Sequence, residues 1–392
     1  MYNRDMDKLM LEGALKVLKK FEEENYQAYI VGGFVRDYLL DIPAYDIDIT
    51  TNCLPNEVER IFPNSFVQSE KYRTVTVSMD GYRYEVTTYR TDSKYKDHRH
   101  PDTKVTKTLK HDVKRRDFTI NALCLDSDLN VIDYVEGLLD LKNKVIRTVG
   151  SPIRRLNEDA LRIFRAFRFA SRLDFEIDVQ TLNAIKLNVS LLKHISKERV
   201  RTELSKTFEE PYFEKVLPLM LEYDLFKEYP DLNEAAKVLN RNYHKVDIIE
   251  FATIASYLKG SVTEEVLLSK KEIKTINQTI EYIKAFENRY LSKKLLLDVD
   301  KKSIISALKI MSIFHNVIYT KEDIDGLLKD MPISSAKELD LDGNDVKKSL
   351  KLEDSPLIKK YLDAALDAVL GGLCQNKKAK LTKYLKGISI DE

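Results

Sequence analysis

The chain has 392 residues, of which 43% are hydrophobic and 32% are charged, a balance typical of a folded globular protein rather than a disordered one. This length is enough for two or three domains. The formal net charge is only +1, so the overall charge does not by itself indicate a nucleic-acid partner. No apolar run reaches the roughly 18 residues of a membrane span, and the polar first residues predict no signal peptide.

The three cysteines, Cys53, Cys124 and Cys374, lie far apart. Their spacing excludes a compact zinc motif and gives no sign of a disulfide framework, so we expect a cytoplasmic protein without membrane association. The stretch 377–386 is basic and carries Tyr384 among its lysines. It fits a solvated helix face as well as a nucleic-acid surface.

Strands and helices are expected to alternate up to about residue 150. A helical pattern comes first, followed by short helices at 34–40 and 56–61. Strands mixed with helices predict a sheet with helices packed on it. The runs that favour strands are 29–31, 45–50, 74–79, 82–89, 122–125 and 145–147.

After residues 151 and 152 the apolar spacing becomes helical and largely stays so. The predicted fold class is therefore α+β, with a mixed sheet and helices in residues 1–150 followed by an all-α part. Candidate joints near 209–211 and 298–302 divide the all-α part into 151–208, 209–300 and 301–392.

The first candidate functional feature is a pair of carboxylates, Asp46 and Asp48, in the predicted strand 45–50. Residues two apart in a strand share a face, so these side chains should project together while Tyr45, Ile47 and Ile49 face the core. Adjacent carboxylates repel unless a cation lies between them, and Mg²⁺ binds through a few carboxylates plus substrate phosphates. Such a centre can activate a 3′-hydroxyl for attack on a nucleoside triphosphate. Solvated carboxylates on an edge strand would give the same pattern.

The segment before the acidic pair favours a phosphate ligand. Gly32 and Gly33 read as a tight turn between the strand 29–31 and the helix 34–40. Glycines there let a triphosphate approach N–H groups at the helix start, and Arg36 can add a guanidinium. A turn that needs positive φ would explain the glycines, but not an arginine so close to the acidic pair.

Two further features leave alternatives open. Glu85, within the strand 82–89, could complete the carboxylate cluster or face solvent on an edge strand. The polar stretch 92–106 is expected to be a loop. Its histidines have no partner ligands at metal-binding spacing, so we do not expect them to bind a metal.

Four motifs, in this order, resemble those of the CCA-adding tRNA nucleotidyltransferases of bacteria and eukaryotes and of their relatives, the bacterial poly(A) polymerases. The resemblance covers about the first 205 residues. Any one motif could arise by chance, whereas four in the family's order are specific. They comprise residues 31–37 with 46–48, 115–122, 158–168 and 196–203.

The resemblance implies a nucleotidyltransferase head (1–150), a neck that selects the nucleotide (151–208), a body (209–300) and a tail that binds tRNA (301–392). It also implies Mg²⁺-dependent addition of C, C and A to the 3′ end of tRNA from CTP and ATP, without a nucleic-acid template. By motif match, Asp46 and Asp48 hold the metal. The residues that would contact the nucleotide are Gly33, Arg36, Arg116, Asp159, Arg162, Arg165 and Arg168.

The neck motif also has a physical logic of its own. On one helix, Asp159 and Arg162 would be surface neighbours, with an apolar stripe through Ile163 and Phe167 on the opposite side. Cytosine and adenine carry an amino donor beside a ring-nitrogen acceptor, which a carboxylate and a guanidinium match. Uracil and guanine invert this pattern and would leave polar groups unpaired, at about 1–3 kcal/mol each. If Asn157 were the N-cap of a helix, Glu158 and Asp159 would lie in its first turn, where the helix dipole favours acids. This alternative would not explain the arginines that follow.

Several alternatives remain. Arg73 stands where CCA-adding members often have glycine, which keeps a poly(A) polymerase open, and a partial enzyme could add only CC or only A. The intact stretch 92–106 disfavours CC-only addition, although His100 stands where an arginine is frequent. A non-catalytic RNA-binding protein would not need the acidic pair. Nothing in the sequence indicates an oligomeric state.

Overall fold

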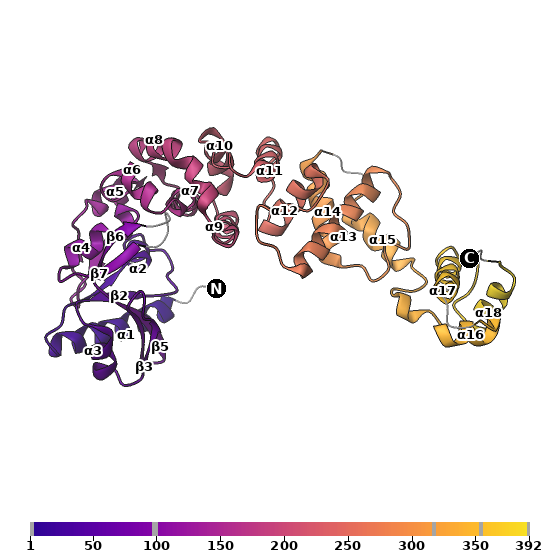
Figure 1. The fold of residues 1–392 in the computed structure, drawn as a ribbon, viewed down its shortest axis with the longest axis horizontal. Coiled ribbons are helices and arrows are strands. Elements are labelled where there is room, and N and C mark those ends of the chain that lie inside the picture. The colour runs from indigo at the N-terminus through magenta and orange to yellow at the C-terminus, as the bar shows by residue number, and fades with distance from the viewer. Residues whose placement is uncertain (1–3, 96–100, 316–318, 353–355, 390–392) are drawn as a thin grey trace. The chain divides into compact units, whose positions relative to one another are not determined.

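The computed structural model describes residues 4–95, 101–315, 319–352 and 356–389 (Figure 1). The chain divides into two compact units, Met1–Pro230 and Asp231–Glu392, called here unit 1 and unit 2. The predicted fold class, α+β, is confirmed. The finer division into four parts stays a prediction.

Unit 1 opens with helix α1 (Arg4–Glu23) and is built on one large sheet. Within the described residues this sheet has seven strands in the order β3-β4-β5-β2-β1-β8-β9. Strands β2 and β5 run parallel and the other neighbouring pairs run antiparallel. The strands are β1 (Ala28–Val31), β2 (Asp48–Thr51), β3 (Ser65–Ser69), β4 (Thr74–Met79), β5 (Tyr82–Thr88), β8 (Cys124–Leu125) and β9 (Val131–Ile132).

The two faces of the sheet differ in what covers them. Helix α1 covers one face, where the Tyr84 hydroxyl donates to the Met10 carbonyl oxygen at 2.8 Å. On the other face, helix α4 (Leu109–Lys114) covers β1 and β8 through a buried cluster that includes Val31, Leu109 and Val113. This second face carries polar side chains over β5, β4 and β3, and the candidate site lies there.

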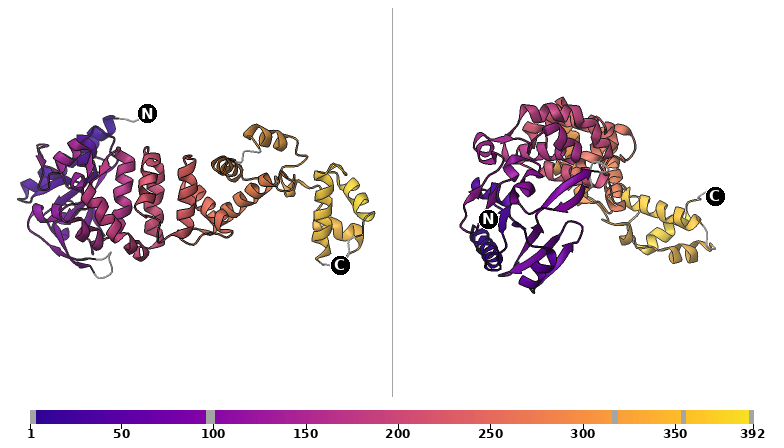
Figure 2. Two further views of the ribbon diagram at one scale, coloured as in Figure 1. Left: turned by 90° about the horizontal axis from the view of Figure 1, so that it is seen from above. Right: turned by 60° about the vertical axis from the view of Figure 1, so that its left-hand side comes forward.

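Short helices α2 (Gly33–Leu39), α3 (Pro55–Ile61) and α5 (Gly137–Asn143) connect the strands, together with the 3₁₀ turn Thr119–Asn121. The helices that complete unit 1 follow residue 151, where Pro152 occupies the first turn of α6. Figure 2 shows that the chain after the large sheet is almost wholly helical. These helices are α6 (Pro152–Glu158), α7 (Leu161–Leu173), α8 (Val179–Asn188), α9 (Lys197–Glu209) and α10 (Phe213–Glu222), with the 3₁₀ segment Val189–His194 between α8 and α9.

Within the described residues of unit 2, all the regular secondary-structure elements are helices. Side chains of Asp247, Ser269, Thr320 and Asp342 form capping boxes at four of its helices, which explains why those helices start where they do. None of the helices in the described part of the chain is both long and apolar enough to cross a bilayer. The helices are α11 (Pro230–Arg241), α12 (Ile248–Lys259), α13 (Lys270–Glu287), α14 (Lys301–Ile313), α15 (Lys321–Lys329), α16 (Gly343–Leu350), α17 (Leu357–Leu370) and α18 (Lys378–Lys386), with a 3₁₀ turn at Ala336–Glu338.

Several expectations about the local structure of the sheet and its surroundings were wrong. The strand expected at 45–50 begins only at Asp48, because its partner β1 ends at Val31, directly opposite. Tyr45 therefore has no strand to hold it against the core and is 82% exposed, whereas Ile47 and Ile49 are each 1% exposed as predicted.

The stretch expected to be a loop is a β-hairpin of β6 (Arg90–Tyr95) and β7 (Pro101–Val105), and β3 was not anticipated. His98 and His100 lie outside the described residues. The part after residue 151 also contains one short strand, β11 (Glu176–Ile177), which pairs in parallel with β10 (Val145–Ile146).

Candidate active site

The two acids of the first motif lie at the start of β2. Asp48 is half-buried and opens the strand, while Asp46 precedes it and is exposed. On the parallel neighbour β5, Glu85 is the residue in register with Asp48, so the two side chains share a face. Burial above all, together with the like charges of Asp46 and Glu85, raises the pKa of Asp48 to about 6, although the charge of Arg116 opposes the rise. Asp48 thus carries a negative charge that the protein alone does not fully neutralise.

The glycine turn brings backbone close to this acid. Gly32 caps α2 with φ +81°, a conformation that favours glycine. A Cβ at Gly32 would lie 3.4 Å from Arg116 Nη1 and 3.5 Å from Asp48 Oδ2. These are ordinary van der Waals distances, so the positive φ is the reason for glycine here, and the turn places the backbone beside both groups.

A cavity of about 460 Å³, called here the arginine pocket, opens beside Asp48. It gathers all the residues that motif matching assigned to the nucleotide, together with one of the two acids. The other acid, Asp46, lies outside it. Its lining comprises Gly32, Gly33, Arg36, Asp48, Arg115, Arg116, Asp117, Asn121, Asp159, Leu161, Arg162, Arg165, Arg168, Phe169, Arg172 and Arg199.

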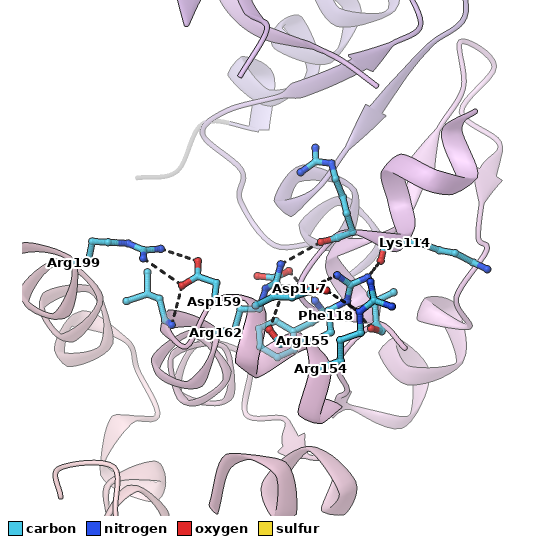
Figure 3. Close-up of polar contacts among 12 residues, drawn as sticks. Lys114, Asp117, Phe118, Arg154, Arg155, Asp159, Arg162 and Arg199 are labelled. Carbon is cyan, nitrogen blue, oxygen red and sulfur yellow. Dashed lines mark hydrogen bonds and ion pairs between the residues drawn. The ribbon is translucent and has the colours of Figure 1, made fainter. Parts of the chain in front are cut away.

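Asp159 lies at a break between two helices rather than inside one. It ends α6 in an extended conformation, with φ −146°, and its carboxylate accepts the N–H of Leu161 at 3.1 Å at the start of α7. Asn157 is inside α6, so the expected N-cap at that residue is wrong. Figure 3 shows Arg199 reaching Asp159 from α9, with its Nη2 2.8 Å from Oδ2.

Arg162, on α7, is 8% exposed and is held by several acceptors. It donates to the Glu158 carboxylate at 3.1 Å and to the Arg155 carbonyl oxygen at 2.7 Å. Arg155 in turn donates to Glu158 and to the Lys114 carbonyl oxygen (Figure 3). Asp159 and Arg162 are therefore presented to the same pocket from fixed positions, although not from one continuous helix.

The remaining arginines of the pocket each meet an acid. Arg165 donates to Asp117 at 2.8 and 2.6 Å, and Arg168 donates to Glu203 at 2.8 Å. Arg172 binds Asp37 at 2.8 Å. Arg36, which is 2% exposed, binds Asp37 at 2.7 Å and Asn121 at 2.5 Å. The guanidinium groups of Arg36, Arg165 and Arg168 lie 4.5 to 5.2 Å from the ring centre of Phe169.

A second cavity, called here the open-face groove, also has a volume of about 460 Å³. It lies over β5, β4 and β3, on the face of the sheet that carries polar side chains. Asp48 lines both cavities. The other groove residues are Asp46, Ile47, Phe66, Gln68, Thr76, Arg83 and Glu85.

Three family profiles match the chain in sequence. They are described as the poly A polymerase head domain (residues 28–147), the probable RNA and SrmB-binding site of polymerase A (174–236), and a putative domain 2 of tRNA nucleotidyltransferase (255–385). The first profile covers the sheet and both acids.

The CCA-adding enzyme of Staphylococcus saprophyticus is 32% identical over 97% of this chain and 99% of its own length. That of Limosilactobacillus reuteri strain DSM 20016 is 35% identical, over 97% of each chain. This chain belongs to the CCA-adding enzyme family. The crystal structure of the Bacillus stearothermophilus CCA-adding enzyme in complex with CTP matches with a TM-score of 0.82 and 31% identity, over 96% of each chain. The Thermotoga maritima enzyme, complexed with tRNA, shares the fold at a TM-score of 0.60 and 24% identity.

Within this family fold, the sequence motifs contain further pocket residues that sequence analysis did not single out. Asp117 and Arg199 lie inside two of the motifs, but their importance comes from partners that only the fold brings near. Arg172 follows Arg168 by four residues, one helical turn later, so helical spacing alone could have placed it beside the pocket.

Asp117 is expected to be a major contributor to the stability of this family member. Burial would raise its pKa, but the charge and hydrogen bonds of Arg165 and the N–H of Phe118 hold that pKa well below its usual range. Asp117→Asn removes the carboxylate charge that faces Arg165, and Glu203 is more distant, at 3.7 Å, so we expect a loss of about 2–4 kcal/mol in the free energy of unfolding.

The pH dependence of unfolding tests the same ion pair. The pKa of Asp117 is lower in the folded state than in the unfolded chain. Its contribution to the free energy of unfolding is therefore present at neutral pH and is lost as pH falls below about 4. Urea unfolding at pH 7 and at pH 3 should therefore show a smaller pH effect in Asp117→Asn than in the unmodified chain. An equal pH effect in both would contradict this assignment.

Proposed function

We propose that this chain adds C, C and A in sequence to the 3′ end of tRNA, using CTP and ATP and no nucleic-acid template. The observation that carries the proposal is that Asp48 forms part of the wall of the arginine pocket, which also holds Asp159 and Arg162. The relatives named as CCA-adding enzymes, and the Bacillus stearothermophilus structure that contains CTP, support it.

Mg²⁺ is the proposed cofactor, held by Asp46 and Asp48. Hard carboxylate oxygens suit this ion, and Asp48 lies beside the like charges of Asp46 and Glu85, which Arg116 offsets only in part. Among the described residues, no three or more His, Cys, Asp or Glu side chains form a group that could hold a metal. This fits an ion that takes its remaining ligands from the substrates and water. When bound, it would help to ionise the attacking 3′-hydroxyl and neutralise the triphosphate.

The arginine pocket is proposed to hold the incoming nucleotide, with its phosphates near Gly33, Arg36 and Arg116. Asp159 and Arg162 would then read the base. A carboxylate has about four acceptor sites. Asp159 can therefore keep its hydrogen bonds from the Leu161 N–H and from Arg199 and still accept one from a base amino group. Arg165 and Arg168 line the same pocket from the next turns of α7.

Arg199 is proposed to be a positioning residue that fixes the Asp159 carboxylate. Without Arg199 the carboxylate can rotate, so Arg199→Ala should raise the KM for CTP about 10-fold and reduce the preference for C over U. Lys197→Ala is the matched control, because Lys197 is exposed on the same helix and lies outside the pocket. Arg199→Ala with unchanged KM and unchanged base preference would exclude this role.

The four-part division is also proposed, with the tail at 301–392 contacting tRNA. We propose the cytoplasm as the location, because Cys53, Cys124 and Cys374 are free thiols, as suits a reducing compartment.

The proposal is tested with a tRNA that ends just before CCA, incubated with CTP, ATP and Mg²⁺. We expect a product three nucleotides longer that ends in CCA. A long A tail would point to poly(A) polymerase activity instead, and no extension would contradict the enzymatic assignment.

A further inference from the structure

We propose that the open-face groove binds the terminal nucleoside of the RNA, with Phe66 as a stacking surface for its base. This inference rests on the proposed function, because it assigns a place to the second substrate of the same reaction. It assigns a role to β5, β4 and β3, which follow β2 in that order towards one edge of the sheet; β2, β5 and β3 are labelled in Figure 1.

Strand register aligns one row of side chains across four strands. Asp48 pairs with Glu85, Glu85 pairs with Thr76, and Thr76 pairs with Phe66. Paired residues of neighbouring strands point to the same face, so this row leads from the proposed metal ligand outwards across the open face. At roughly 4.8 Å per strand, the row spans about 14 Å between its outermost Cα atoms, which is long enough to accommodate a nucleoside.

The position of the groove follows from the chemistry of phosphoryl transfer. The attacking and leaving oxygens lie roughly in line, on opposite sides of the phosphorus atom. The triphosphate is proposed to lie in the arginine pocket, so the attacking hydroxyl must approach the phosphorus atom from a second direction, opposite the leaving group. Asp48 lines both cavities, so a hydroxyl held in the groove can reach the same acid as a triphosphate held in the arginine pocket.

The charges of the groove suit an RNA end rather than a second triphosphate. Its described lining carries Asp46, Asp48 and Glu85, against the cation Arg83. Such a surface would repel a triphosphate, but it can hold a nucleoside whose one phosphate meets Arg83.

Phe66 and Gln68 give the groove a defined shape. Phe66 lines the groove and is 51% exposed on β3, so part of its ring is available for stacking with a base. Gln68 receives a hydrogen bond from the Thr76 hydroxyl at 3.0 Å and donates to Glu85 at 3.0 Å. This chain holds the Glu85 carboxylate in place between Phe66 and Asp48.

Kinetics of Phe66 variants test the assignment. Stacking of a base on an aromatic ring is worth about 1–3 kcal/mol, which corresponds to roughly 10- to 100-fold in affinity. Phe66→Ala should therefore raise the KM for tRNA about 10-fold or more, while the affinity for CTP without tRNA stays unchanged. Phe66→Tyr should restore the KM. The control is Tyr134→Ala, since Tyr134 is 43% exposed and lines neither cavity.

Photocrosslinking gives a readout that does not depend on turnover. The probe is a tRNA that ends just before CCA with 4-thiouridine as its last base, irradiated with the enzyme and Mg²⁺ but no nucleotide. We expect crosslinks to peptides of β3 and β5, with a yield that falls several-fold in Phe66→Ala.

Crosslinks confined to α7, or a Phe66→Ala variant with an unchanged KM for tRNA, would overturn this assignment while leaving CCA addition intact. Failure of the unmodified chain to extend any tRNA would instead overturn the proposed function, and the crosslinking map would still test the groove.

Discussion

Replacing Asp48 with Asn should abolish nucleotide incorporation and at the same time make the folded protein more stable. The activity loss should be at least about 1,000-fold in kcat, because bound Mg²⁺ contributes several kcal/mol of charge stabilisation in the transition state. Binding of tRNA should change little, since the substitution removes no contact of the helical parts. Single-turnover incorporation and tRNA binding would be measured side by side.

The gain in stability follows from the raised pKa of Asp48, about 6 against an ordinary 3.8. A carboxyl whose folded pKa is raised costs the fold free energy once it ionises, at 1.36 kcal/mol per pKa unit. The cost is absent below about pH 4, grows between pH 4 and 6, and is complete above pH 6. Asp48→Asn should therefore gain about 1–3 kcal/mol in the free energy of unfolding at pH 7.5 without metal, and nothing at pH 4.

Asp46→Asn is the matched control for this pair of effects. Asp46→Asn should also abolish incorporation, because Asp46 is the other proposed metal ligand. Its gain in stability should be smaller than that of Asp48→Asn, because Asp46 is exposed. An Asp48→Asn protein that incorporates nucleotides at more than a few per cent of the normal rate would contradict the role of Asp48. A loss of stability at pH 7.5 would contradict the proposed cost of its charge.

Replacing Arg162 with Ala should relax the choice of base. Arg162 is proposed to supply the donors for the ring nitrogen of C or A, so its loss should remove the penalty for bases with the inverse pattern. With about 1–3 kcal/mol per unsatisfied polar group, the ratio of kcat/KM for CTP over UTP should fall roughly 10- to 100-fold. Arg162→Lys should also lose selectivity, because a lysine lacks the planar fork of donors.

Arg154→Ala is the control for Arg162→Ala. Arg154 binds the same Glu158 at 3.0 Å, but its side chain is 76% exposed and lies outside the arginine pocket. If both variants lose selectivity equally, the effect comes from Glu158 rather than from base contact. Full selectivity in Arg162→Ala would exclude a templating role for this residue.

The candidate nucleotide-contact residues could be named from the sequence because they lie in compact motifs. The glycine turn and the neck arginines depend on local backbone geometry and helical spacing, which a sequence shows directly. The apolar stripe of α7 is buried as predicted, with Ile163 and Phe167 at 0% exposure. The seven nucleotide-contact candidates lie at one pocket, although their roles remain proposals.

The ion pairs of the pocket could not be predicted, because they join residues far apart in the chain. Arg199 reaches Asp159 across 40 positions and Arg172 reaches Asp37 across 135. The break between α6 and α7 at Asp159 could not be predicted either, since no glycine or proline marks it. The early end of β2 depends on where its partner β1 stops, which is a property of the sheet and not of residues 45–50.

Arg73 is a non-glycine residue at a position where the family resemblance led us to expect glycine. It adopts φ +54°, a left-handed conformation that glycine enters more easily. The fold thus accommodates arginine in this conformation, although its presence raises the backbone cost of this turn.

Stepwise addition of single nucleotides tests the central claim most directly. Three tRNAs that end before CCA, after the first C and after the second C would each be offered CTP, ATP, UTP or GTP alone in Mg²⁺. The account predicts that C is added to the first two substrates, a single A is added to the third, and U and G are rejected throughout. Addition of C to the third substrate, repeated addition of A, or no addition to any of the three would contradict it.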